Sequence, residues 1–157
     1  MTDIRELRPD DWPDVARIYG DGLDEGTFED AVPSWEQWDA GHLPAPRLIA
    51  TLNGETAGWA ALGPVSAREC YRGVTEDSIY VAREARGAGI GRSLLEELIR
   101  QADAADIWTI EARVLAGNEA SVALHTACGF RVVGTRERLA QKHGVWRDVI
   151  VLERRAR

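Results

Sequence analysis

Cysteine, positive charge and long hydrophobic runs are all scarce in this sequence. The two cysteines, Cys70 and Cys128, form neither a CxxC motif nor any other paired spacing, which is typical of free thiols in a reducing cytosol. The uncharged apolar stretches are too short to span a bilayer, and the first residues contain no apolar segment of the signal-peptide kind. We therefore expect a cytoplasmic protein with no membrane association.

The charge balance of the sequence is acidic. It holds 19 Lys and Arg against 26 Asp and Glu, which gives a formal net charge of −7. This balance argues against a general partner role for nucleic acid or an anionic membrane surface. The apolar content of 45% and the charged content of 29% are ordinary for a soluble globular protein. The length indicates one domain, residues 1–157, with a sizeable core.

Apolar periodicity and turn residues predict the order of the elements. Asn53-Gly54 indicates a tight hairpin turn, and Ser34 with Gln37 forms a capping box at a helix start. We expect strands at 4–7, 47–52, 55–62, 75–81, 108–114, 131–139 and 145–153, and helices at 10–19, 34–41, 89–105 and 118–128. This order, βααβββαβαββ, predicts an α+β fold (an α/β sandwich) with a mixed central β-sheet flanked by helices on both faces.

The segment 77–92 is the most informative part of the chain. A strand pattern leads into the glycine-rich turn Arg86-Gly-Ala-Gly-Ile-Gly91, and a helix of strong helix formers follows directly. This construction points backbone N–H groups and a helix N-terminus at an anion, usually a phosphate. Glycine allows the close approach and the positive φ that such a turn requires. An ordinary strand-to-helix turn is the alternative, but three glycines between Arg86 and Arg92 favour the anion site.

The glycine spacing distinguishes between kinds of phosphate site. Neither the dinucleotide fingerprint GxGxxG nor a P-loop Gly-Lys-Ser/Thr occurs. The pattern Arg86-x-x-Gly89-x-Gly91 resembles the acetyl coenzyme A (acetyl-CoA) pyrophosphate loop of the Gcn5-related N-acetyltransferase (GNAT) family. The stretch 118–130, which begins with Asn118 and ends in Gly-Phe, resembles the family's second element. The two motifs have the expected order and separation, and the resemblance covers nearly the whole chain.

The resemblance implies a GNAT fold and acetyl-CoA as a cosubstrate, with no metal. In this family the strand before the loop splays away from its neighbour, and the pantetheine arm lies in the gap. The loop amides would hold the pyrophosphate, and Asn118, which is also a plain N-cap candidate, would contact the arm. The implied cofactor-binding residues are Ile79, Tyr80, Val81, Arg86, Gly87, Ala88, Gly89, Ile90, Gly91, Arg92, Asn118 and Ser121.

Acetyl transfer to an amine requires a base, a hydrogen bond to the thioester oxygen and a route for the leaving thiolate. Glu76 is the candidate base, because a partly desolvated carboxylate at this strand would have a raised pKa. Asp77 is its rival, on the opposite face of the strand, and a solvated strand-edge acid is the alternative for each. The backbone N–H of Val81 is the candidate donor to the thioester oxygen. Such a direct transfer requires positioning rather than a covalent intermediate.

His125 departs from the family pattern. Many members of the family carry a tyrosine general acid at this place, seven residues after the asparagine, which here is Asn118. The imidazolium could replace this acid, or the thiolate could leave unaided and take a proton from water. A packed core histidine is the third interpretation, and the sequence leaves all three open.

Four segments resemble phosphinothricin and methionine sulfoximine acetyltransferases: Gly63-Pro64 followed by Ala67-Arg68 and Tyr71, then 76–81, 118–130 and Lys142-His-Gly-Val-Trp-Arg-Asp-Val149. These enzymes acetylate the α-amine of glutamate-like amino acids. A small zwitterionic acceptor would follow, with its carboxylate on Arg68 or, alternatively, Arg72. The implied acceptor-binding residues are Thr27, Phe28, Glu29, Arg68, Tyr71 and His143. A solvated acidic loop is the alternative for 20–33.

The oligomeric state and the exact acceptor have competing interpretations. His143 would reach the acceptor pocket from its own chain or from a twofold-related subunit, because these relatives are commonly homodimers. The acceptor could instead be a polyamine, an aminoglycoside or a protein N-terminus. A non-catalytic module that binds acyl-CoA is the alternative from another class, and the presence of Glu76 disfavours it.

Overall fold

The computed structural model describes residues 1–24 and 27–156. Its element order confirms the predicted βααβββαβαββ arrangement and the α+β class. The strands are β1 (Thr2–Glu6), β2 (Arg47–Leu52), β3 (Glu55–Pro64), β4 (Val74–Val81), β5 (Thr109–Leu115), β6 (Arg131–Lys142) and β7 (Val145–Arg155). The helices are α1 (Trp12–Asp21), α2 (Trp35–Ala40), α3 (Ile90–Ala104) and α4 (Glu119–Ala127), with short 3-10 turns η1 (Pro9–Asp11), η2 (Glu69–Tyr71) and η3 (Arg83–Ala85).

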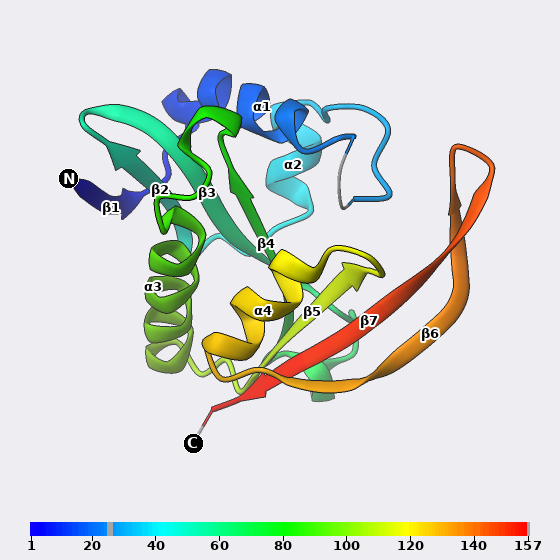
Figure 1. Ribbon diagram of the computed structural model, residues 1–157. Helices are drawn as coiled ribbons and strands as arrows, with labels where there is room; N and C mark the ends of the chain where they lie inside the picture. The colour runs from blue at the N-terminus through cyan, green and yellow to red at the C-terminus, as the bar shows by residue number, and fades with distance from the viewer. Residues whose placement is uncertain (25–26, 157) are drawn as a thin grey trace.

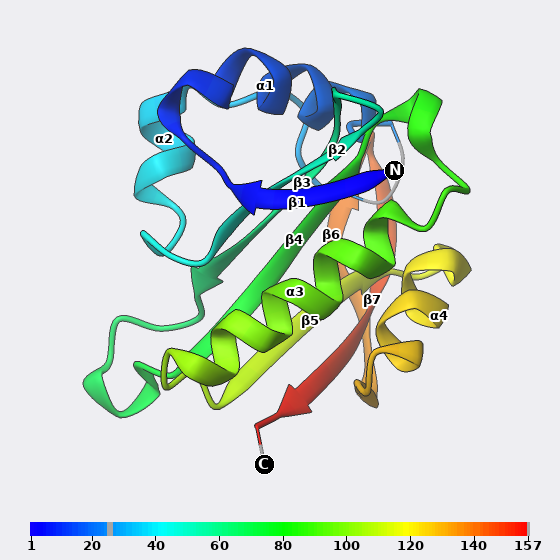
Figure 2. The same cartoon turned by 90° about the vertical axis from the view of Figure 1, so that its left-hand side faces the viewer.

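One mixed sheet carries the fold, with its strands in the order β1-β2-β3-β4-β5-β7-β6. Helices α1 and α2 cover one face, and α3 and α4 cover the other (Figures 1 and 2). Adjacent residues of β3 illustrate the two layers: the Trp59 ring stacks near Tyr19 of α1, whereas the open side of Gly58 faces Ile90 and Leu94 of α3. No helix within the described residues is both long and apolar enough to cross a membrane.

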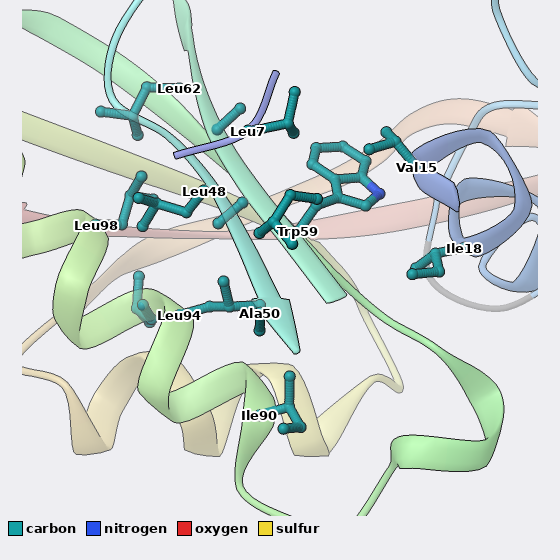
Figure 3. Packing of buried hydrophobic residues seen from close by; sticks show 14 of the residues in the cluster. Leu7, Val15, Ile18, Leu48, Ala50, Trp59, Leu62, Ile90, Leu94 and Leu98 are labelled. Atoms are coloured by element: carbon teal, nitrogen blue, oxygen red, sulfur yellow. The ribbon is translucent and has the colours of Figure 1, made fainter. Parts of the chain in front are cut away.

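The hydrophobic core lies on both faces of the central strands. Figure 3 shows Trp59 directed toward Val15 and Ile18 of α1, with Leu94 and Leu98 of α3 on the opposite side. Each of these side chains is fully excluded from solvent. Burial of this size of apolar side chain contributes about 1.5–3 kcal/mol per residue. The core therefore fixes the central strands, and with them the neighbouring strand β4.

The strands β4 and β5 diverge, as the family resemblance implied. They pair in parallel over three residue pairs, Val74 with Thr109, Thr75 with Ile110 and Glu76 with Glu111. Pairing ends there, although β4 continues to Val81 and β5 to Leu115. The other side of β4 remains paired with β3 along its whole length. The edge of β4 beyond Glu76 is thus left without a β5 partner, in a fixed position.

The hairpin of β6 and β7 extends beyond the body of the molecule (Figure 1). Both strands are longer than predicted: β6 ends at Lys142 rather than 139, and β7 at Arg155 rather than 153. The register between them shifts between Arg136 and Ala140. This irregularity breaks the apolar alternation that the sequence prediction followed in β6, which explains why that strand was predicted to end early. Exposed apolar side chains on the hairpin are Val132, Val133, Leu139, Val145 and Trp146.

Candidate active site

A cavity of about 550 Å³ lies where β4 and β5 diverge. It is lined by the diverging strands, by the start of α4 and by residues of α1 and the connector that follows it. Of the predicted site residues, it brings together Thr27, Glu29, Glu76, Ile79, Tyr80, Val81, Arg86, Gly91, Asn118, Ser121 and His125. This cavity joins both sequence motifs, which lie far apart in the chain.

The glycine-rich turn forms one end of the cavity. Gly87 and Gly89 have φ values of 84° and 80°, and a Cβ at either position would meet no described atom within 4 Å. Gly89 is also the N-cap of α3, a helix of 15 residues. The first N–H groups of a helix have no intrahelical acceptor, so this open turn fits an anion such as a pyrophosphate. The side chain of Ile90 packs in the core, which leaves only its backbone for such a role.

Arginines surround the turn in different ways. Arg86 donates from Nη2 to the backbone oxygen of Asp21 at 3.3 Å, which ties the turn to the end of α1. Arg92 forms an ion pair with Glu96 one turn along α3, at 2.7 Å between Nε and Oε1. Arg86 lines the cavity and Arg92 points along the helix surface. The two residues that flank the glycines are therefore not equivalent.

Asn118 begins α4 beside the cavity. Its Oδ1 accepts a hydrogen bond from the backbone N–H of Ser121 at 3.2 Å, which confirms the predicted N-cap. Asn118, Ser121 and Leu124 line the wall opposite the free edge of β4. A pantetheine arm between them would meet unpaired backbone groups on one side and the start of α4 on the other.

Glu76 is the last residue of β4 that pairs with β5. Its Oε1 lies 3.8 Å from Nε of Arg113, and Glu111 is its register partner on β5. Burial raises the pKa of Glu76, and the charge of Arg113 partly offsets this rise. The direction agrees with the shift predicted for a base at this position. The role of Glu76 as the base stays a prediction.

Asp77, the neighbour of Glu76, points to the other face and contacts His125. Asp77 Oδ2 lies 2.8 Å from Nε2 of His125, and each side chain is 5% exposed. Nδ1 of His125 donates to the backbone oxygen of Ser121 at 2.7 Å. Both ring nitrogens therefore face oxygen acceptors. Burial acts to lower the pKa of His125, but the hydrogen bond and charge of Asp77, together with the Ser121 carbonyl, raise it above its ordinary value.

Described residues of the connector after α1 line another part of the cavity, and Lys142 binds this connector. The Nζ of Lys142 donates to the backbone oxygens of Leu23, at 2.7 Å, and of Thr27. Lys142 is 5% exposed, which excludes the alternative that this motif lysine lies on the surface of a simple turn. Thr27 and Glu29 line the cavity from this anchored segment. The tip of the β6–β7 hairpin thereby positions the loop that faces Glu76.

Among the cavity residues that sequence reasoning missed, His42 and Arg113 carry titratable or charged side chains. His42 follows α2; its Nδ1 donates to the Trp38 backbone oxygen at 2.6 Å, and burial lowers its pKa. Arg113 lies on β5, on the same face as Glu76. Strand alternation could have placed Arg113 next to Glu111, but only the β4–β5 register shows that Glu76 is beside them.

Several predicted acceptor residues lie elsewhere in this chain. Arg68 and Tyr71 are exposed on the segment before β4, with the Arg68 guanidinium 5.7 Å from the Tyr71 ring centre. That segment leads into the paired end of β4, whereas the cavity opens beyond Glu76. Phe28 is half-buried outside the described lining, and His143 is exposed at the tip of the β6–β7 hairpin. Their binding roles stay predictions. Among residues 1–24 and 27–156, no group of three or more His, Cys, Asp and Glu could hold a metal ion.

Known proteins resemble this chain along most of its length. The profile of the Acetyltransferase (GNAT) family matches residues 1–130. A phosphinothricin N-acetyltransferase of Alcaligenes faecalis is 35% identical and covers 96% of this chain and 81% of its own. An L-methionine sulfoximine/L-methionine sulfone acetyltransferase of Pseudomonas paraeruginosa is 32% identical and covers 96% and 92%.

Two solved structures share the fold over almost the whole chain. A GNAT superfamily phosphinothricin acetyltransferase from Sinorhizobium meliloti, in complex with acetyl-CoA, is 30% identical, with a TM-score of 0.89 over 99% of this chain and 88% of its own. A ribosomal-protein-alanine N-acetyltransferase from Brucella melitensis is 35% identical, with a TM-score of 0.88 over 97% and 98%. These two structures share one fold, but they are named for different acceptors: phosphinothricin and the alanine of a ribosomal protein.

Proposed function

Because this chain belongs to the acetyltransferase (GNAT) family and is an amine N-acetyltransferase, we propose that it acetylates the α-amine of a small amino-acid-like acceptor. Acetyl-CoA, which is bound in the structure of the Sinorhizobium meliloti relative, supports the choice of acetyl donor. In this proposal the amine attacks the thioester directly, within a ternary complex. The observation that carries the proposal is the divergence of β4 and β5 directly beyond Glu76. Within this opening, the acetyl group of the donor and the carboxylate of Glu76 would share one cavity.

The donor occupies the part of the cavity between β4 and α4. The turn 86–92 binds the pyrophosphate through backbone amides, and the pantetheine arm pairs with the free edge of β4 at 79–81. Asn118 and Ser121 face the arm from the start of α4. The open space at Gly87 and Gly89, where no Cβ stands, supports this placement.

Catalysis then requires a base for the amine, a hydrogen bond to the thioester oxygen and a proton for the leaving thiolate. Glu76 removes a proton from the acceptor ammonium, directly or through a water, and the neutral amine attacks the thioester carbon. The backbone N–H of Val81 stabilises the negative charge that develops on the oxygen. The C–S bond breaks, and the thiolate takes a proton from water, because both N–H groups of His125, the other candidate acid, are already bound by Asp77 and the Ser121 carbonyl. The raised pKa of Glu76, which burial causes, supports its role as the base.

The acceptor is an amino acid of the phosphinothricin or methionine sulfoximine type, since relatives over nearly the whole chain are named for these substrates. A protein N-terminus is the second candidate, and the ribosomal-protein-alanine N-acetyltransferase of the same fold favours it. We also propose a single domain, a cytoplasmic location and a homodimer. The exposed thiol of Cys70 supports the location, and the apolar side chains of the β6–β7 hairpin support the dimer.

A thiol-release assay with acetyl-CoA tests the proposal. The panel contains methionine sulfoximine, phosphinothricin, spermidine, an aminoglycoside and an N-terminal alanine peptide. We expect turnover with the first two and its loss in Glu76→Gln. Turnover with the peptide alone would transfer the proposal to protein N-termini. Binding of acetyl-CoA without turnover of any amine would leave an acyl-CoA-binding module instead.

A further inference from the structure

Arg113 has a place in the cavity that the proposed mechanism does not use. The parallel register puts Glu76 beside Glu111, and Arg113 follows Glu111 by two residues on β5. Because strand side chains alternate, all three lie on one face of the sheet, whereas Ala112 and Val114 are buried against the other. Arg113 lines the cavity, and its side chain is 39% exposed.

The guanidinium of Arg113 is only loosely engaged within the chain. Its Nη2 lies 3.3 Å from Oε2 of Glu111, and its Nε lies 3.8 Å from Oε1 of Glu76. By contrast, Arg154 grips Asp103 through two nitrogens, at 2.8 and 2.9 Å. A guanidinium has five N–H donors in a planar fork that matches a carboxylate. Arg113 therefore keeps donors that can turn toward a ligand in the cavity.

We propose that Arg113 binds the carboxylate of the acceptor and thereby selects α-amino acids. The inference rests on the proposed function, which places the acceptor amine at Glu76. The amine nitrogen and carboxyl carbon of an α-amino acid lie about 2.5 Å apart. Glu76 and Arg113 present opposite charges 3.8 Å apart on the same face. One zwitterion therefore meets both: its ammonium faces Glu76 and its carboxylate faces Arg113.

Arg113 suits this task better than Arg68 does in this chain. Arg68 lies outside the described lining of the cavity, beside Tyr71. The competing explanation is that Arg113 only separates the negative charges of Glu76 and Glu111. A residue with that role would affect every amine alike, because it would act through the base. A carboxylate-binding residue affects only acceptors that carry a carboxylate.

The experiment pairs two acceptors with three variants. L-Methionine sulfone and its decarboxylated counterpart, methylsulfonylpropylamine, differ by the carboxylate alone. In Arg113→Met we expect the KM of the amino acid to rise about 10- to 100-fold, the range for losing a hydrogen bond to a charged group. The KM of the amine stays within about twofold of the original protein, and Arg113→Lys recovers part of the loss. Arg68→Met tests the rival carboxylate site, and the inference requires that it leave the KM ratio of the two acceptors unchanged.

Two further measurements make each outcome decisive. Circular dichroism and the Kd of acetyl-CoA verify that the Arg113 variants fold and keep the donor site. Equal effects of Arg113→Met on both acceptors would overturn the inference while the proposed function stands. A larger change in the ratio for Arg68→Met would assign the carboxylate to Arg68. Absence of turnover with every amino acid in the unaltered protein would remove the proposed function, and this inference with it.

Discussion

Asp77 and His125 form a buried pair across the gap between β4 and α4. Their side chains meet at 2.8 Å, and the opposite ring nitrogen of His125 is fixed by the Ser121 carbonyl. The ring also packs edge-on against Phe130, with centres 4.9 Å apart. The imidazole is thus fixed in place and donates from both nitrogens. His125 stands where the family pattern has a tyrosine, and the carboxylate of Asp77 holds it there.

Removal of this carboxylate should reverse the pKa shift of His125. In Asp77→Asn, burial dominates, so we expect the pKa of His125 to fall below its ordinary value instead of lying above it. The sequence has three histidines, so NMR titration of the imidazole signals separates them. His42, whose pKa is lowered by burial and which is not in contact with Asp77, is the internal control and should keep its titration. An unchanged His125 titration would show that Asp77 does not set its proton affinity.

The same pair links stability to pH. A raised histidine pKa contributes stability that is complete below the ordinary histidine pKa and is lost as the pH rises through the raised value. We expect the free energy of unfolding of Asp77→Asn to be lower by about 1–3 kcal/mol at pH 6. The deficit should narrow at pH 9. Urea unfolding at the two pH values measures the difference, and a constant deficit would contradict the linkage.

Glu76→Gln should lose activity and gain stability. The raised pKa of Glu76 means that folding favours its neutral form, so its stabilising contribution is lost as the pH rises through the raised value. Glutamine is neutral at every pH, so the variant should melt at a higher temperature than the original protein at pH 8 and equally at pH 4. Calorimetric Tm and turnover measure the two effects. Glu55→Gln, at the exposed start of β3, is the charge-matched control and should change neither.

Much of the fold was predictable because local chemistry and tertiary packing agree. Asn53 and Gly54 have φ values of 53° and 86°, which fits the hairpin turn that their sequence predicts. Ser34 and Gln37 form the predicted capping box. Asp11 stands at the N-cap of α1, but its carboxylate makes no capping hydrogen bond to that helix; it accepts from the Arg5 guanidinium at 2.7 and 2.8 Å and from the backbone N–H of Arg8. Partners outside the helix thus replace the capping bond there.

The candidate site was less predictable because its acceptor side depends on register and long-range contact. The glycine turn and the Asn118 helix carry their own local pattern, so the donor side could be predicted from the sequence. Arg113 has no motif, and only the pairing of Glu76 with Glu111 reveals its place. Lys142 binds carbonyls more than a hundred residues away in the chain. No local periodicity reports such a contact.

Lys142 should resist chemical modification. It is the sole lysine of the sequence, it is 5% exposed and it donates to two backbone oxygens. Reductive methylation of the folded protein should therefore label the N-terminus alone, and unfolding in urea should add the lysine signal. Mass spectrometry of digests measures both. Ready methylation in the folded state would contradict the buried anchor.

Loss of this anchor should act on the acceptor rather than on the donor. In Lys142→Met the backbone oxygens of Leu23 and Thr27 lose a charged donor, so the connector that carries Glu29 loosens. We expect the acceptor KM to rise about tenfold, with the Kd of acetyl-CoA unchanged. Lys142→Arg keeps the charge and should recover part of the loss. Equal effects on acceptor and donor would indicate general destabilisation.

Gly89→Ala should weaken the donor site through backbone strain. The φ of 80° at this position costs an alanine about 1–2 kcal/mol, although no described atom would touch the new Cβ. The backbone of the turn would shift to relieve this strain, and the amides at the start of α3 would then no longer all point at the pyrophosphate. We expect the Kd of acetyl-CoA to rise about tenfold in calorimetry.

Gly54→Ala separates that effect from strain as such. Gly54 has a φ of 86° and open space around it, but it lies in the turn between β2 and β3. Its alanine variant should lose a similar amount of stability and bind acetyl-CoA as the original protein does. If the two variants bind acetyl-CoA equally well, the amides at the start of α3 do not hold the pyrophosphate. If only Gly89→Ala loses affinity, the orientation of the backbone amides at the start of α3 accounts for the binding of the pyrophosphate.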